Sequence, residues 1–195
     1  MQDGITIYFV RHGQTTWNAA RRIQGQLESD LSELGREQAA GNGRRLRELL
    51  PGIDKLPFVA SPLRRCRNTM EIIRGELGLN PHDYTTDDRL KEIHFGFLQD
   101  TYWQDFAPKH PDQAAAREAD PYNWRPDGGE SYADLTDRTA GWIKEIDRDT
   151  VVVSHGGVSR ALRGTLYNID PVEVTELRVP QDKIMLLRKS GHEWL

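Results

Sequence analysis

The chain is poor in the features that mark several classes of protein. It has one cysteine, Cys66, in 195 residues, which excludes an internal disulfide and fits a reducing compartment. No apolar run approaches the roughly 18 residues of a membrane span, and Met1–Gly4 resembles no signal peptide. A formal net charge of −4 argues against general nucleic-acid binding, so any affinity for phosphate must be local. We therefore expect a cytoplasmic protein with neither a membrane nor a nucleic-acid partner.

Metal-binding patterns and repeats are also missing. The histidines stand at positions 12, 82, 94, 110, 155 and 192, and they form neither an i, i+4 pair nor a His-Glu-x-x-His motif. We therefore expect no metal site. There is no internal repeat and no low-complexity segment, and the length suits one domain with its own core, spanning residues 1–195.

Strand-like and helix-like segments alternate along the chain. Short apolar runs predict strands at Ile5–Val10, Phe58–Ala60, Tyr84–Thr86, Thr150–Ser154 and Lys183–Leu187. Between and after them, capping residues and apolar spacing predict helices at Ser32–Leu50, Arg64–Leu77, a segment that starts at Ser131 with Asp134 as capping partner, and Val158–Tyr167. This order predicts an α/β fold, a three-layer α/β/α sandwich whose mostly parallel central sheet is covered on both faces.

Residues 95–132 differ from the rest of the chain. They hold half of its aromatic residues, are rich in Pro, Asp and Gly, and show no strong period. We therefore expect an irregular, lid-like excursion that determines substrate specificity. A small satellite core of Tyr102, Trp103, Phe106 and Trp124 is the alternative, and the aromatic rings can serve both purposes.

Two predicted strands end on a histidine that is followed by glycine. Arg11-His12-Gly13 follows the first strand, and His155-Gly156 follows the fourth. The carboxyl ends of strands in an open α/β sheet face the crevice where ligands bind. Neutral His12 can attack phosphorus if its other ring nitrogen is held by an acceptor such as a backbone carbonyl. The planar guanidinium of Arg11 suits phosphate oxygens.

Other residues of the right chemistry lie between these histidines. Arg64 follows Ser61-Pro62-Leu63 at a predicted helix start. Together with Arg11 and a protonated His155, it could face the three equatorial oxygens of a transferring phosphoryl group. Glu92 is the natural proton donor for the leaving oxygen. Each residue alone could be structural, as a surface arginine, a solvated glutamate or a core histidine, but the whole set favours phosphoryl transfer.

Five segments, in this order, resemble the motifs of the histidine phosphatase superfamily, the phosphoglycerate mutase-like proteins. They are Arg11–Asn18, Ser61–Cys66, Leu90–Gly96, Gly128–Ser131 and Ser154–Gly157. The resemblance implies that His12 becomes a phosphohistidine and that Glu92 is the general acid and then the base that activates water. It implies that Arg11, Arg64 and His155 hold the phosphoryl group. The assisting residues would be Asn18, Gln24, Gly25 and Gly156. The family uses no metal or organic cofactor for this chemistry.

The chain departs from the family pattern at a few positions. Cys66 stands where alanine is usual, which we interpret as a packed thiol rather than a redox group. Asp100 replaces a common glycine and puts the shape of its loop in question. Trp17 could stack on substrate or anchor the loop after His12. The excursion offers mainly Lys109 and Arg117 as cations, fewer than a mutase insertion carries, which favours hydrolysis over mutase transfer.

The sequence thus predicts a metal-independent phosphomonoesterase (a hydrolase) that acts on a small phosphorylated metabolite. The alternatives are an isomerase of the phosphoglycerate mutase type and a non-catalytic phosphate-binding module. The identity of the substrate and the oligomeric state stay open.

Overall fold

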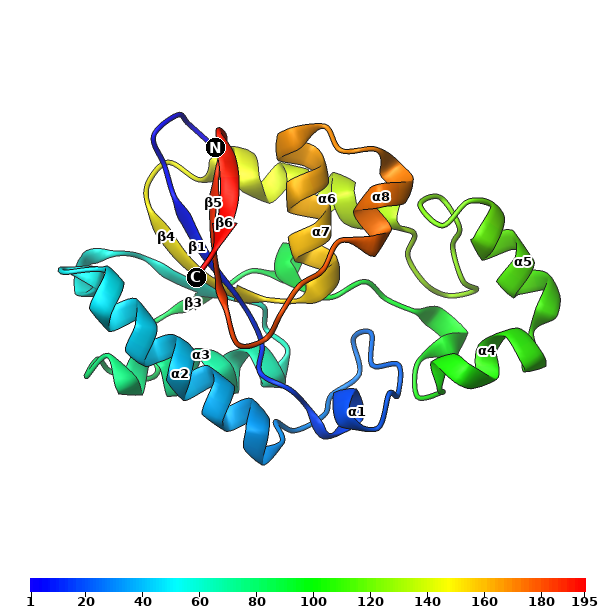
Figure 1. Cartoon of the computed structure of the whole chain (residues 1–195), viewed down its shortest axis with the longest axis horizontal. Helices are drawn as coiled ribbons and strands as arrows, with labels where there is room; N and C mark the ends of the chain where they lie inside the picture. Colours follow the sequence, from blue (N-terminus) through cyan, green and yellow to red (C-terminus); the bar gives the residue numbers. More distant parts are fainter.

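A six-stranded sheet forms the centre of the computed structural model, which describes all 195 residues (Figure 1). The strand order is β3-β2-β4-β1-β5-β6. The strands are β1 (Ile7–Arg11), β2 (Phe58–Ala60), β3 (Thr85–Thr86), β4 (Thr150–Ser154), β5 (Ile184–Arg188) and β6 (Gly191–Trp194). The first four strands of this order run parallel, and β5 and β6 are antiparallel to their neighbours. The mostly parallel sheet expected from the sequence is confirmed.

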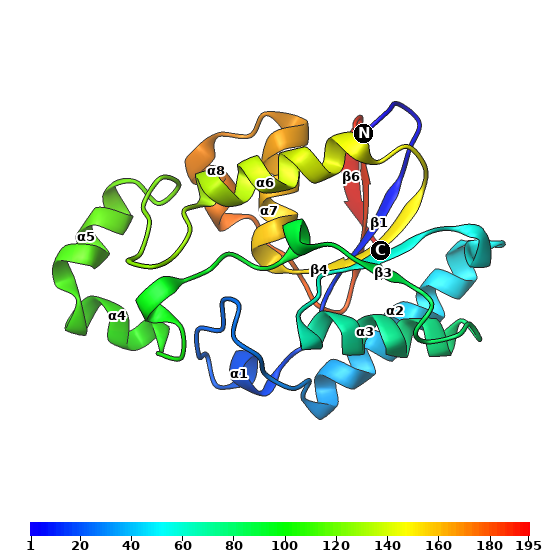
Figure 2. The ribbon, with the colours of Figure 1, turned by 180° about the vertical axis from the view of Figure 1, so that it is seen from behind.

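Helices cover both faces of the sheet (Figure 2). They are α1 (Thr16–Ala19), α2 (Glu33–Leu49), α3 (Arg64–Glu76), α4 (Trp103–Lys109), α5 (Pro111–Ala119), α6 (Tyr132–Glu145), α7 (Gly156–Tyr167) and α8 (Pro171–Glu176). Three short 3-10 turns lie at Ile53–Lys55, Asp88–Leu90 and Gly96–Leu98. The pair α2 and α3 packs on one face and the pair α6 and α7 on the other, so the three-layer sandwich is confirmed. No helix has the length and apolar character to cross a membrane.

Alternation along the buried strands divides the core into two halves. Ile7 and Phe9 of β1 belong to the core under α6 and α7, whereas Tyr8 and Val10 belong to the core under α2 and α3. Successive side chains of a strand point to opposite faces, so a wholly apolar strand suits a sheet that is covered on both sides. This packing fixes the strand ends at which the histidines lie.

Side-chain caps define the starts of two predicted helices. The Ser32 side chain accepts a hydrogen bond from the Gly35 N–H at 3.0 Å at the start of α2. At α6, Ser131 and Asp134 form a capping box, in which each side chain accepts a hydrogen bond from the backbone N–H of the other. Such a cap stabilises a helix by about 1 kcal/mol. Both predicted starts are confirmed.

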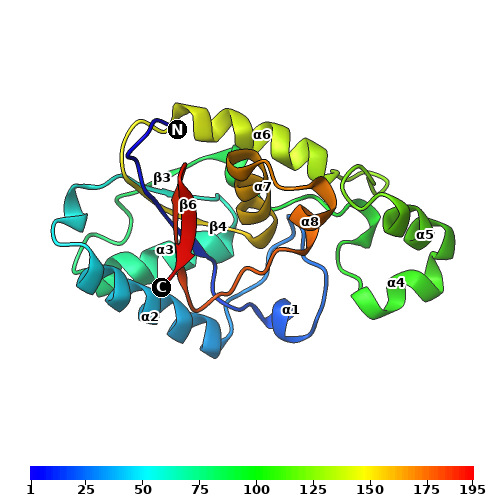
Figure 3. The same cartoon turned by 45° about the horizontal axis from the view of Figure 1, so that its top comes forward.

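The prediction of an irregular excursion at residues 95–132 is wrong, because α4 and α5 lie within it (Figure 3). Pro108 stands inside α4 and Pro111 opens α5, where its fixed φ is compatible with a first turn. No residue of α5 is buried, and the sequence therefore lacks the periodic apolar residues by which a helix is predicted. Helix α8 and the exposed edge strand β6 also escaped prediction.

The aromatic residues of the excursion serve two environments. Phe106 is buried in a small cluster with Ile23 and Leu98, and Trp124 packs against it. Trp103 is 41% exposed instead and lines the cavities described below. Of the predicted satellite core, Phe106 and Trp124 are thus present, whereas Tyr102 and Trp103 are exposed.

Candidate active site

The two strand-end histidines lie side by side. Strands β1 and β4 pair in parallel with Arg11 opposite Ser154, so the residues that follow them emerge at the same edge of the sheet. The His12 N–H donates a hydrogen bond to the Ser154 carbonyl at 2.9 Å. The rings of His12 and His155 meet edge to face, with their centroids 5.2 Å apart.

His12 is held in the form that a nucleophile needs. Its Nδ1 lies 2.8 Å from the Gly13 carbonyl oxygen, and only an Nδ1–H can donate to that acceptor, which leaves the Nε2 lone pair free. The side chain is 3% exposed, and burial, followed by the charges of Arg65 and Arg11, lowers the pKa of His12 well below its usual range. His12 is therefore neutral at physiological pH. A Cβ at Gly13 would overlap the Gly35 carbonyl oxygen, so this tight passage requires glycine.

A cavity of about 180 Å³ lies at Arg11 and Gly156, the chain neighbours of His12 and His155, whereas neither histidine itself lines it. It is lined by Arg11, Asn18, Arg22, Ile23, Gln24, Gly25, Arg65, Glu92, Phe95, Trp103, Gly156 and Arg160. Six of the residues predicted from the sequence are among them, namely Arg11, Asn18, Gln24, Gly25, Glu92 and Gly156. These six come from distant parts of the chain, and the fold brings them together at one end of the sheet.

The placement expected of Arg64 is wrong, and its neighbour Arg65 occupies the site instead. The Arg64 side chain is 46% exposed and its Nε lies 3.3 Å from the carboxylate of Asp30. Arg65 is 1% exposed and lines the cavity. Its Nη2 and Nη1 donate hydrogen bonds to the carbonyls of Gly25 and Leu27 at 2.7 and 2.9 Å.

Helical geometry explains this exchange. Adjacent residues of an α-helix point about 100° apart, so Arg64 and Arg65 cannot face the same way. Arg65 lies one turn before Thr69 and two turns before Ile73, which are both fully buried. The spacing of the buried residues along α3 therefore indicates that Arg65 faces inward, whereas the position of the helix start does not distinguish Arg65 from Arg64.

Glu92 is anchored at the cavity by backbone donors. Its carboxylate accepts hydrogen bonds from the N–H of Gly157 at 3.1 and 3.2 Å and from the N–H of Ile93 at 3.0 Å. A Cβ at Gly157 would overlap the Glu92 carboxylate, so glycine at this position lets the acid approach the start of α7. Arg138 donates to the backbone carbonyl of Glu92 and not to its carboxylate. The carboxyl group is thus positioned without a cation that would bind it permanently.

His155 lies in surroundings that disfavour a charged ring. It is fully buried, and its Nε2 shares a hydrogen bond with the Ser61 hydroxyl at 2.7 Å. Burial, followed by the charge of Arg65, lowers the pKa of His155 well below its usual range. This pKa direction favours a neutral ring at physiological pH, and the protonated His155 expected opposite a phosphoryl group stays a prediction. The sequence placed the histidine correctly but could not show the positive charges around it.

Cys66 lies against His155. Its sulfur is 3.4 Å from the Nε2 of His155 and 3.5 Å from the Ser154 carbonyl oxygen. Burial raises the pKa of the Cys66 thiol, so it stays protonated. A buried, protonated thiol is unreactive, which agrees with the interpretation of Cys66 as a packing residue.

The loop after His12 contributes a cation that the sequence did not reveal. Arg22 lines the cavity, lies over the Trp17 ring at 4.3 Å and forms an ion pair with Asp100. Asp100 has a φ of +73°, which explains why glycine suits this position. Trp17 is therefore a packing partner of Arg22 and does not line the cavity.

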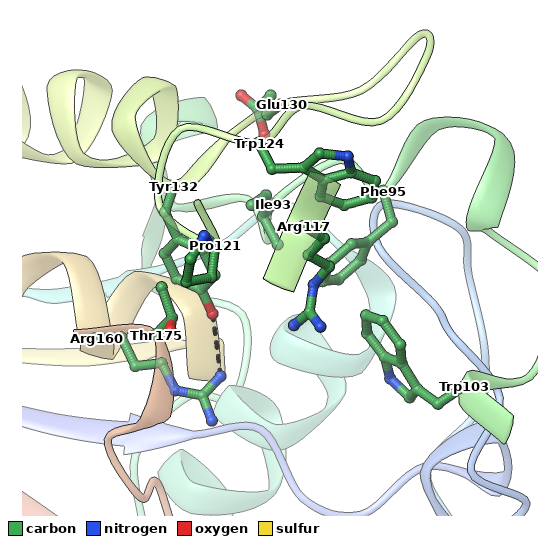
Figure 4. A pocket seen from close by; sticks show the side chains of 10 residues that line it. All are labelled: Ile93, Phe95, Trp103, Arg117, Pro121, Trp124, Glu130, Tyr132, Arg160 and Thr175. Atoms are coloured by element: carbon green, nitrogen blue, oxygen red, sulfur yellow. Dashed lines mark hydrogen bonds between the residues drawn. The ribbon is translucent and has the colours of Figure 1, made fainter. Parts of the chain in front are cut away.

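A second cavity, of about 250 Å³, adjoins the first and shares Phe95, Trp103 and Arg160 with it (Figure 4). It is lined by Ile93, Phe95, Trp103, Arg117, Pro121, Trp124, Glu130, Tyr132, Arg160 and Thr175. The excursion that sequence patterns marked for specificity supplies several of these side chains. No group of three or more His, Cys, Asp or Glu side chains is arranged to hold a metal ion.

Proteins of known sequence match most or nearly all of the chain. Residues 7–195 match the histidine phosphatase superfamily (branch 1). A metal-independent phosphoserine phosphatase of Arabidopsis thaliana is 40% identical over 164 residues, which are 80% of this chain and 66% of that protein. A glucosyl-3-phosphoglycerate phosphatase of Mycolicibacterium vanbaalenii is 37% identical over 183 residues, which are 86% of this chain and 76% of that protein.

A mutase and a solved phosphatase structure are also similar. A probable phosphoglycerate mutase of Erwinia tasmaniensis is 32% identical over 196 residues, covering 98% of this chain and 88% of that protein. The structure of a mycobacterial glucosyl-3-phosphoglycerate phosphatase in complex with VO3 matches with a TM-score of 0.81 at 30% identity. The match covers 98% of this chain and 97% of that one.

Proposed function

Because the chain belongs to the histidine phosphatase superfamily, we propose that it hydrolyses a small phosphorylated metabolite through a phosphohistidine at His12. The family predicted from the sequence motifs is confirmed, and the chain is a phosphatase, a phosphoric monoester hydrolase. We propose that residues 1–195 act as one catalytic domain. The cytoplasmic location stays a prediction.

One observation carries the proposal, namely a neutral histidine near two buried guanidinium groups, each with an Nε that has no hydrogen-bond partner. The Nε atoms of Arg11 and Arg65 are buried and have no hydrogen-bond partner. A buried donor without an acceptor costs about 1–3 kcal/mol, and more when it is charged. A phosphoryl group bound in the cavity that both arginines line would offer oxygen acceptors to these guanidinium groups. This arrangement supports attack on an anionic phosphorus centre.

In the first step, the Nε2 lone pair of His12 attacks phosphorus, so that a P–N bond forms while the ester P–O bond breaks. Glu92, in its acid form, gives its proton to the leaving oxygen. Arg11 and Arg65 stabilise the negative charge that spreads over the equatorial oxygens. We assign the remaining contacts of this group to His155, Asn18, Gln24, Gly25 and Gly156.

In the second step, water attacks the phosphohistidine. Glu92, now a carboxylate, takes a proton from the water as its oxygen bonds to phosphorus. The P–N bond breaks, its electron pair returns to His12, and inorganic phosphate leaves. No metal ion is needed, because the buried guanidinium groups provide the positive charge.

The similar mutase makes transfer to a second hydroxyl the alternative outcome. A mutase must retain a phosphorylated acid while the group moves, which calls for several cations around the substrate. Of the three cations at residues 95–132, only Arg117 lines one of the two cavities, since Lys109 is 67% exposed and pairs with Asp105, and Arg125 is 59% exposed and pairs with Asp134. This favours hydrolysis. Incubation with 3-phosphoglycerate separates the two, because a mutase yields its positional isomer and a phosphatase yields inorganic phosphate.

Acid-quench labelling tests the proposal. Protein incubated briefly with ³²P-labelled substrate should carry an acid-labile adduct, which His12→Ala abolishes and His82→Ala preserves, since the His82 side chain is 76% exposed and lines neither cavity. Activity should also survive EDTA. An adduct that persists in His12→Ala would overturn the assignment of the nucleophile. Phosphate binding without release from any tested ester would favour a binding module.

A further inference from the structure

The second cavity contains two arginines that no carboxylate of the protein neutralises. The guanidinium group of Arg117 makes no hydrogen bond or ion pair and lies over the Trp103 ring at 5.1 Å. Arg160 donates to the Leu177 carbonyl at 2.8 Å and to the Tyr132 hydroxyl at 3.1 Å, both of which are neutral. In Figure 4, both guanidinium groups point into the space between Tyr132 and Trp103.

The one acidic residue in the lining does not balance this charge. Glu130 accepts hydrogen bonds from Arg138 at 2.9 and 3.0 Å and from the N–H of His94 at 2.8 Å. Its carboxylate is therefore already paired with a cation outside the cavity lining. The space next to Arg117 and Arg160 consequently has a net positive charge.

The position and walls of the cavity favour a substrate group over bulk solvent. Because Arg160, Phe95 and Trp103 line both cavities, a phosphomonoester bound at His12 can extend directly into the second one. Its volume of about 250 Å³ suits a group of a few atoms rather than a second large body. Phe95, Trp103, Trp124 and Tyr132 place aromatic surface around the two guanidinium groups, and an ion pair formed beside such surface is stronger than one in bulk water.

We propose that this second cavity binds a carboxylate of the substrate through Arg117 and Arg160, so that the substrate is a small phosphorylated carboxylic acid. The proposal rests on the phosphatase function proposed above. A guanidinium presents parallel N–H donors that match the two oxygens of a carboxylate. The Tyr132 hydroxyl, which already accepts from Arg160, can donate its own proton to the same carboxylate.

Matched pairs of substrates test this proposal. O-phosphoserine and O-phosphoethanolamine differ only in a carboxylate, while 3-phosphoglycerate and glycerol 3-phosphate differ in a carboxylate in place of a hydroxymethyl group. One pair carries an ammonium group and the other does not, so agreement between them isolates the effect of the carboxylate. We expect kcat/KM for phosphate release to favour the acid in each pair.

The variant Arg117→Ala should reduce that preference, measured as the ratio of kcat/KM values, by about 10- to 100-fold, the loss expected for one hydrogen-bonded ion pair. The matched control is Lys109→Ala, which removes the same charge from the same excursion but from outside the cavity. The control should keep the ratio of the original protein.

Equal kcat/KM values within both pairs, or a ratio that Arg117→Ala leaves unaltered, would overturn the proposal. A preference for the ammonium compounds would overturn it as well and would assign the cavity to Glu130. Hydrolysis of p-nitrophenyl phosphate that depends on His12 separates these results from a failure of the phosphatase function, because that substrate has no carboxylate.

Discussion

Replacing Arg65 by alanine should nearly abolish catalysis, whereas replacing Arg64 should not. Arg64 is a matched control for Arg65, because the two arginines are adjacent in α3 and only Arg65 is buried at the cavity. Arg64 is half exposed and interacts with Asp30 at the surface. The two variants remove the same charge from the same helix turn, so a difference between them reports the direction of the side chain.

The surroundings of Arg65 set the size of the expected loss in kcat/KM. Arg65 presents an unpaired Nε beside a neutral His12, and both are shielded from solvent. Loss of one preorganised donor to a developing oxyanion costs about 10²- to 10³-fold in rate, and loss of an arginine that stabilises a phosphoryl transition state costs about 10³- to 10⁵-fold. We therefore expect kcat/KM of Arg65→Ala to fall by about 10³-fold, equivalent to about 4 kcal/mol. For Arg64→Ala we expect a change within about threefold, as for a solvent-exposed pair.

Steady-state kinetics with p-nitrophenyl phosphate measures these values. Arg65 also donates to the carbonyls of Gly25 and Leu27, and leaving these unpartnered costs about 1–3 kcal/mol of stability. Thermal unfolding must therefore show that the variant is folded at the assay temperature. Arg65→Lys keeps the charge but not the planar donors, so its kcat/KM should lie between those of Arg65→Ala and the original protein. Equal losses in both alanine variants, or less than a tenfold loss in folded Arg65→Ala, would refute the reasoning.

Three further predictions follow from the same contacts. Glu92→Gln should slow hydrolysis of alkyl phosphates by about 10²- to 10⁴-fold but p-nitrophenyl phosphate much less, and equal losses would mean that Glu92 is not the acid. Since burial holds the pKa values of His12 and His155 below the unfolded value of about 6.5, the unfolded chain binds more protons as pH falls. The free energy of unfolding, measured with urea, should therefore be highest above about pH 6.5. Below that pH it should decrease by up to about 2.7 kcal/mol per pH unit, because two groups take up protons on unfolding. His12→Ala removes one of these groups and should halve the slope. Asp100→Gly should be more stable than Asp100→Ala by about 1 kcal/mol, because both lose the ion pair with Arg22 but only alanine keeps the strain of a positive φ; equal melting temperatures would contradict this.

The parts of the fold that could be predicted are those with strong local signals. The apolar run of β4 and the capping box of Ser131 and Asp134 each agree with the final packing, so local preference and tertiary structure point the same way. Helix α5 lacked such agreement, since none of its residues is buried and no side chain caps its start. Strand β6 is an exposed edge that pairs with β5 across a two-residue connection, and it lacks the apolar run by which the other strands were predicted.

The residue types of the active site could be predicted from the sequence, but the directions in which the side chains point could not. Residue types and their order indicated His12 and Glu92, because few other residues offer a nucleophilic imidazole and a carboxyl group near strand ends. The choice between Arg64 and Arg65 required the rotational phase of α3. Arg22 and Arg160 required the tertiary fold, since each reaches the cavity from a segment whose sequence is ordinary.

The protonation of His155 depends both on its residue type and on the charges that the fold places around it. A protonated His155 would suit a dianionic phosphoryl group, yet burial, followed by the charge of Arg65, lowers the pKa of the ring and favours its neutral form. The same cations keep His12 neutral and therefore nucleophilic. A bound dianion would offset the charge of Arg11 and Arg65 and would raise the pKa of His155 again, because an opposite charge nearby favours the protonated form. The positive charges thus prepare the nucleophile before the substrate binds, and the substrate itself supplies the condition under which His155 can gain its proton.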